Sequence, residues 1–119
     1  MSPLKSVEIS SPQGRVIYPL RVVQKIVERT VIHQQGVKSL EKNREESIRI
    51  EARKGLITLN LFLILNLERR VPEVAWELQR NLKENLERAT GLKVGQINIY
   101  VQGFDSPKID RVPLVGIPG

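Results

Sequence analysis

The chain has 119 residues and no cysteine, and its 19 basic and 13 acidic residues give a net charge of +6. This length suits one domain with a modest core. The lack of cysteine excludes disulfides, thiolate metal sites and thiol nucleophiles, and it is compatible with a cytoplasmic setting. The basic residues are dispersed, so the charge either serves solubility or attracts nucleic acid, acidic lipid or an acidic protein. No stretch approaches the roughly 20 apolar residues of a membrane-spanning helix, and we expect a soluble protein.

Both ends of the chain differ in composition from its middle. Residues 1–13 contain two prolines and four serines, and only Val7 and Ile9 alternate, which predicts a flexible N-terminal arm or a short edge strand. Residues 104–119 have no periodicity, and three prolines and two glycines interrupt them, which predicts an extended tail. We therefore place the folded domain at residues 14–103.

The first half of this domain predicts a strand, a helix and a second strand. Residues 14–18 read as a short strand, and Pro19 suits the start of the helix that follows. Apolar residues recur every three or four positions between residues 20 and 31, and Gly36 suits a left-handed C-terminal cap. After a polar loop, residues 48–53 alternate between apolar and charged side chains, as a half-buried strand does.

The second half predicts a strand, a long helix and a last strand. Residues 57–66 have one wholly apolar face and one mixed face. Pro72 begins an amphipathic helix, Gly91 ends it, and residues 97–103 alternate again. The order strand-helix-strand-strand-helix-strand predicts an α+β two-layer sandwich, in which two helices pack on one face of a mainly antiparallel sheet.

The reactive side chains do not predict a catalytic site. His33, the single histidine, falls near the end of the first helix, where it suits a capping role better than that of a base or metal ligand. Glu45 and Glu46 are neighbours in a loop and tend to diverge. Phosphate-binding, dinucleotide-binding and nucleophile motifs are absent from the sequence. We therefore predict no catalytic residues, no cofactor and no metal, and a non-enzymatic protein.

The mixed sheet face predicts an interaction surface. If the helices cover the leucine face, Phe62, Ile64 and Tyr100 emerge on the opposite face near Arg49 and Arg53. Such an apolar patch favours self-association, and this is our preferred interpretation. The alternative is that Arg49, Arg53, Phe62 and Tyr100 bind single-stranded nucleic acid, because aromatic rings beside arginines stack on bases. The basic-glycine-aromatic motif of RNA-recognition modules is missing, which weighs against this alternative.

Trp76 is a second candidate contact. It lies outside the apolar stripe of the second helix, beside Arg80 and Lys83. Either it rests against a loop or tail of its own chain, or it anchors a partner, because tryptophan is enriched at interface hot spots.

One block of the sequence resembles a known family. The block comprises Val71–Ala75, Gln79, Asn81, Lys83, the Gly91-Leu92 turn and Ile97–Gly103. It is similar to the alkaline shock protein family of bacterial envelope-stress proteins, and the similarity extends over most of residues 14–103. The resemblance implies a cytoplasmic interaction or scaffold protein, a homo-oligomer that a separate membrane-anchoring protein holds at the membrane in some members. It also implies a role in envelope stress response or envelope homeostasis, and it supplies no catalytic residues.

Overall fold

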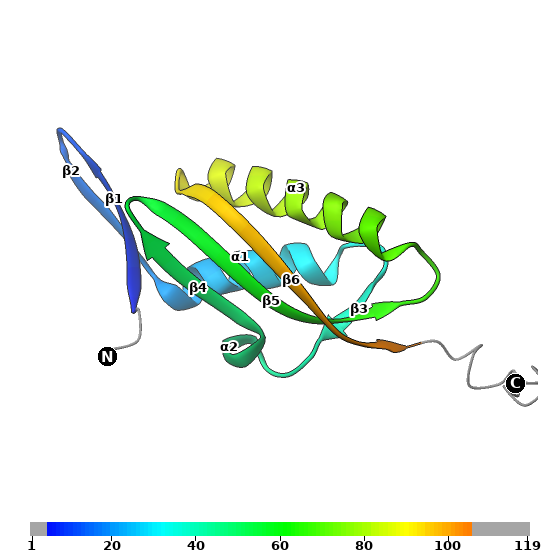
Figure 1. Ribbon diagram of the computed structural model, residues 1–119. Helices are drawn as coiled ribbons and strands as arrows, with labels where there is room; N and C mark the ends of the chain where they lie inside the picture. Colours follow the sequence, from blue (N-terminus) through cyan, green and yellow to red (C-terminus); the bar gives the residue numbers. More distant parts are fainter. Residues whose placement is uncertain (1–4, 106–119) are drawn as a thin grey trace, which may run out of the picture.

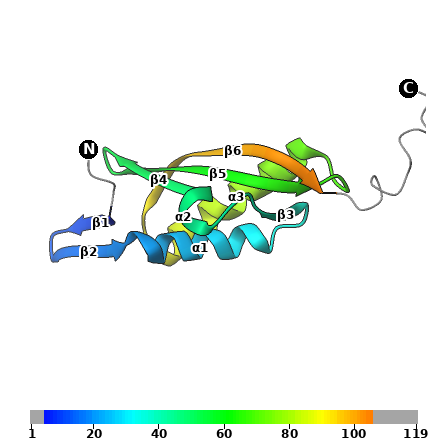
Figure 2. The same ribbon diagram turned by 90° about the horizontal axis from the view of Figure 1, so that it is seen from below.

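Residues 5–105, the part of the chain that the computed structural model describes, form six strands and three helices. The helices are α1 (Leu20–Ile32), the single-turn α2 (Arg44–Ser47) and α3 (Val71–Thr90). The strands are β1 (Ser6–Ser11), β2 (Gly14–Pro19), β3 (Val37–Leu40), β4 (Ile48–Arg53), β5 (Leu56–Asn66) and β6 (Lys93–Asp105). The two long helices pack on the same face of the main sheet (Figures 1 and 2). The predicted α+β two-layer sandwich is confirmed.

Strand β5 is the centre of the main sheet. Strands β3 and β4 pair antiparallel with its two halves along one side, and β6 pairs parallel with it along the other. The parallel pairing follows from α3, which crosses over between β5 and β6. Strands β1 and β2 form a separate antiparallel hairpin that projects beyond the sheet (Figure 1). The pairing is thus mainly antiparallel, as predicted.

The alternation of β5 builds the core. Leu59, Leu61 and Leu63 are fully buried under the helices, whereas the intervening side chains are half-exposed on the other face. Each buried side chain of this size contributes about 1.5–3 kcal/mol relative to exposure. The helices supply the facing side chains, which are Val23, Val27 and Val31 of α1 and Val74, Leu78, Leu82 and Leu86 of α3.

The N-terminal segment is more ordered than predicted. Residues 6–11 form strand β1, in which Val7 is buried and Ile9 packs against the core. The hairpin is tied to the domain by the Tyr18 hydroxyl, which donates to the Thr90 carbonyl at 2.8 Å. Of the two predicted alternatives for this segment, residues 6–11 adopt the short edge strand, because Val7 is buried and Ile9 packs beside it, and the flexible arm was wrong for these residues. Residues 1–4 lie outside the described part.

Strand β6 also passes the predicted end of the domain. It continues through Phe104 and Asp105, and the Asp105 carboxylate pairs with Lys38 at 3.3 Å. The predicted tail begins too early by these two residues, and its remainder, 106–119, lies outside the described part of the chain.

Gly36 has a different role from the predicted one. The C-cap of α1 is His33, and Gly36 lies three residues later, in the turn before β3, with a φ of +97°. A Cβ atom there would lie 2.4 Å from Cγ2 of Val74, so the turn packs directly against α3.

Glu87 holds the start of β6 against α3. Its Oε2 atom accepts from the backbone N–H of Val94 at 2.9 Å and from Lys83 Nζ at 3.2 Å. The hydrogen bond from Val94, followed by that from Lys83, lowers the pKa of Glu87 below its ordinary value. The folded state therefore favours the ionised carboxylate.

Because the folded pKa is lowered, this stabilisation is present above the unfolded pKa of about 4.3 and disappears as the pH falls through the folded value. We expect Glu87→Gln to be less stable than the wild type at pH 7, and the difference to vanish near pH 3. Urea unfolding at several pH values measures it. The control is Glu84→Gln, at an exposed position of the same helix. An equal difference at pH 7 and pH 3 would contradict the assignment.

Candidate interaction surface

No helix covers the second face of the main sheet within the described residues (Figure 2). The strand register places the side chains of alternate residues there, and all of them are exposed or half-buried. We call this surface the open face. It comprises Arg49, Glu51 and Arg53 of β4, Thr58, Asn60, Phe62 and Ile64 of β5, and Gln96, Asn98 and Tyr100 of β6.

Three side chains form a stacked row across the open face. The rings of Phe62 and Tyr100 lie parallel, with centroids 4.8 Å apart and an interplanar angle of 12°. The guanidinium of Arg49 lies 5.2 Å from the centroid of Phe62. Because β5 lies between β4 and β6, Arg49 and Tyr100 approach the Phe62 ring from opposite sides. Both faces of Phe62 are therefore occupied, and Tyr100 is 44% exposed at the edge of the row.

A polar row crosses the sheet beside the aromatic row. The Asn98 amide donates to Oδ1 of Asn60 at 3.0 Å, and the Asn60 amide donates to Oε2 of Glu51 at 3.1 Å. This chain of bonds holds side chains from all three strands in fixed positions. The open face is thus a preformed surface with one apolar and one polar row.

The predicted residues are only partly brought together. Phe62, Ile64 and Tyr100 share the open face with Arg49, as the alternation of the strands predicts. Arg53 lies on the same face but pairs with Leu56, six residues along β5 from Phe62, which corresponds to about 20 Å. The predicted nucleic-acid set therefore does not converge on one spot.

Trp76 lies on the helix layer and not on the open face. It is 67% exposed, so the described part of its own chain does not cover it. It belongs to the side of α3 that faces β6, where Gln79 donates to the Ile97 carbonyl at 3.0 Å and Lys83 to the Val94 carbonyl at 3.2 Å. Trp76 lies one turn before these contacts, as a separate exposed aromatic group.

The domain as a whole matches one known protein family. Residues 8–106 match the family model of the alkaline shock proteins, whose description gives a cell envelope-related function. The chain belongs to the alkaline shock protein family. The resemblance seen in the sequence is thereby confirmed, as is the relation to the cell envelope at the level of the family.

Solved structures share the fold of this alkaline shock family protein at low identity. Two variants of MamM CTD match with a TM-score of 0.50 and 12% identity, over 72% of this chain and 96% and 98% of theirs. At this identity the likeness concerns the fold alone. None of the curated proteins matches the chain.

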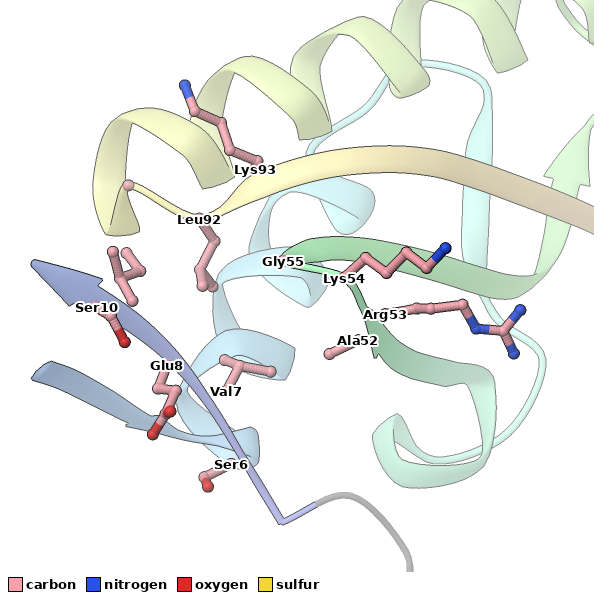
Figure 3. Close-up of a pocket in the computed structure, with 12 residues that line it drawn as sticks. Ser6, Val7, Glu8, Ser10, Ala52, Arg53, Lys54, Gly55, Leu92 and Lys93 are labelled. Carbon is pink, nitrogen blue, oxygen red and sulfur yellow. The ribbon is translucent and has the colours of Figure 1, made fainter.

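A hollow of about 490 Å³ lies between β1 and the β4–β5 turn of the alkaline shock family protein (Figure 3). Val7 and Leu92 face this hollow, whereas the charged ends of Arg53, Lys54 and Lys93 extend away from it (Figure 3). The lining combines apolar side chains with the polar side chains of β1, and within the described residues the Glu8 carboxylate pairs with Arg15, which does not line the hollow.

The reactive residues singled out in the sequence have local structural partners. Nδ1 of the exposed His33 lies 2.7 Å from the Arg29 carbonyl at the end of α1. The Asn43 side chain caps α2 by accepting from the Glu46 N–H at 2.8 Å, and the Glu46 carboxylate accepts from the Asn43 amide at 2.7 Å. Glu45 lies in the same first turn. Within residues 5–105 no cluster of three metal-binding side chains forms, and no helix there is long and apolar enough to span a membrane.

Proposed function

We propose that this alkaline shock family protein is a non-enzymatic scaffold of the cell envelope that self-associates through its open face. The row of Arg49, Phe62 and Tyr100 carries the proposal. This row lies at the middle of a sheet that no described helix covers, and the half-buried Ile64 follows Phe62 on the same face. Apolar and aromatic surface of this kind gains free energy when a second copy covers it.

The proposal places the protein in the cytoplasm, at the membrane periphery, where a membrane-anchoring protein holds it during envelope stress or homeostasis. Family membership supports the relation to the envelope. Trp76 supports a second contact, because it is 67% exposed and lies on the other layer, away from the open face. A protein with two such surfaces binds a partner and its own copies at the same time, as a scaffold requires.

Self-association is tested by light scattering over a range of protein concentrations. We expect the mass of the wild type to rise with concentration. The double variant Phe62→Ser and Tyr100→Ser should associate at least about tenfold more weakly, because it loses two central aromatic contacts. Trp76→Ser is the matched control, since it removes an exposed aromatic side chain from the other layer and should leave the association unchanged. A strictly monomeric wild type at the highest concentration would refute self-association.

Binding of single-stranded nucleic acid is the competing function. The net charge of +6 and the exposed ring of Tyr100 favour it. Three observations weigh against it, since both ring faces of Phe62 are occupied, Arg53 is distant and Glu51 adds a negative charge to the face. Fluorescence anisotropy with a single-stranded RNA at low salt separates the two functions, and we expect no binding. Binding that falls steeply with salt and is lost in Tyr100→Ser would favour the competitor.

A further inference from the structure

A groove follows the outer side of the helix layer, between α1 and α3, which lie side by side (Figures 1 and 2). It encloses about 480 Å³. Val22 and Ile26 of α1 and Ala89 of α3 form its apolar part. A second hollow of about 270 Å³ continues it toward His33, and the two hollows share Arg29, Thr30 and Asn85. Neither hollow belongs to the open face, since the helices separate them from it.

Hydrogen bonds from α3 to α1 and to the turn that follows α1 fix the floor of the groove. The Asn85 amide donates to the Thr30 hydroxyl at 3.3 Å, and the Asn81 amide donates to Oε1 of the buried Gln34 at 2.9 Å. Thr30 in turn donates to the Ile26 carbonyl at 3.1 Å. The spacing of the two helices is therefore set before any partner binds.

The rims of the groove are positively charged. Lys25 and Arg29 project from α1 and Arg88 from α3, and among the described residues no carboxylate lines either hollow. Seven other basic residues within 5–105 form ion pairs, whereas no carboxylate of this described part lies within 4.0 Å of these three. The three rim cations thus form no ion pair within the described part of the chain.

We propose that this groove binds an amphipathic helix of a partner protein, with apolar side chains on the face that enters the groove and carboxylates on its flanks. A third helix fits between two packed helices because its ridge of side chains fills the groove they form. From Val22 to His33 the groove extends about 16 Å, or three helical turns. The carboxylates pair with the rim cations and fix the orientation of the helix.

The charge and the shape of the groove favour this partner over two other occupants, a second copy of the chain and an anionic lipid surface. The long helices of a second copy are poorly suited, because the apolar faces of α1 and α3 are already buried in their own core, and α1 is also basic. An anionic lipid surface is flat, whereas the apolar residues here lie in a concave groove between charged rims. An acidic amphipathic helix matches both the basic rims and the concave apolar groove.

The probe is a labelled 18-residue helical peptide with leucine and alanine on one face and glutamate on the other, and its counterpart carries lysine in place of each glutamate. We expect the acidic peptide to bind in an anisotropy titration and the lysine peptide to bind at least tenfold more weakly. The double variant Arg29→Glu with Arg88→Glu should bind the acidic peptide at least tenfold more weakly than the wild type. The matched control Lys54→Glu with Arg70→Glu changes the charge equally at two exposed positions that line neither hollow, and it should leave the affinity within twofold.

A second variant separates docking in the groove from simple charge attraction. Ala89→Trp fills the groove without changing the charge, so it should weaken binding of the acidic peptide at least fivefold. The thermal unfolding midpoint of this variant should stay close to that of the wild type. Full affinity in Ala89→Trp, or no binding of the acidic peptide to the wild type at low salt, would overturn the proposal. A third result would also overturn it. If the protein does not bind the peptide but co-sediments with phosphatidylglycerol vesicles, and this requires Arg29 and Arg88, the occupant of the groove is lipid.

The groove and the open face are tested independently. The titrations are repeated in the Phe62→Ser and Tyr100→Ser background, which is intended to remove self-association and leaves the groove residues intact. If only the groove variants lose peptide binding, the result bears on the groove proposal. If the Phe62→Ser and Tyr100→Ser background changes only the mass in light scattering, the result bears on the proposed scaffold function.

Discussion

Replacement of Gly36 by alanine should destabilise the domain by about 3 kcal/mol. Two costs combine, since an alanine at a φ of +97° is strained, and its Cβ would meet Cγ2 of Val74 at 2.4 Å. Val74 is buried in the core at the first turns of α3 and has little room to move. A loss of this size is a large share of the 5–15 kcal/mol typical of a domain, and urea unfolding measures it.

Gly55→Ala is the matched control for the backbone strain. Gly55 has a φ of +80° but nothing lies within 4 Å of its Cβ position, so we expect only about 1 kcal/mol there. Adding Val74→Ala to Gly36→Ala should recover part of the loss, and the double-mutant cycle isolates the clash. Equal losses in Gly36→Ala and Gly55→Ala would show that the packing against α3 contributes nothing.

Replacement of Leu61 by alanine should cost about 3–4 kcal/mol, because the side chain is fully buried at the middle of β5 and leaves a cavity beneath the helices. Thermal unfolding should shift by more than about 10 °C in a domain of this size. The control is Leu56→Ala on the same strand, where 47% of the side chain is exposed and the cost should stay below about 1 kcal/mol. Similar losses at the two positions would contradict the assignment of the core.

The elements with strong periodicity could be predicted from the sequence. The alternation of β5 places its leucines under the helices and Phe62 on the open face, and Gly91 ends α3 in the left-handed conformation, with a φ of +79°. The bulge at Gly95 also follows from its place in a strand. These features depend on neighbours in sequence, which is why local patterns reveal them.

The missed elements depend on pairing across the fold or on weak signals. Strand β3 has only four residues, and it is a strand because it pairs with the end of β5. Helix α2 had a usable signal, since Asn43 and Glu46 have the spacing of a capping box. The parallel direction of β6 is set by the crossover of α3, and periodicity carries no information on direction.

The two candidate surfaces also differ in how far the sequence predicts them. The open face could be predicted, because the sides of a strand alternate along the chain. The stacking of Phe62 between Arg49 and Tyr100 could not, since it requires the order of three strands. The groove between α1 and α3 was also missed, because the sequence shows which residues of each helix point outward but not how the two helices lie together.

Every strand of the main sheet is bonded to β5, and β3, β4 and β6 have no bond to one another. An outer strand can therefore separate while the other pairings persist, but the loss of β5 removes every pairing at once. Cooperativity is thus concentrated in one strand of eleven residues. Its odd-numbered side chains support the helices that frame the groove, and its even-numbered side chains display the open face. Loss of one of the buried leucines of β5 should therefore impair both proposed surfaces together, whereas substitutions on the outer side of the helices, or at Phe62 and Tyr100, should affect one surface at a time.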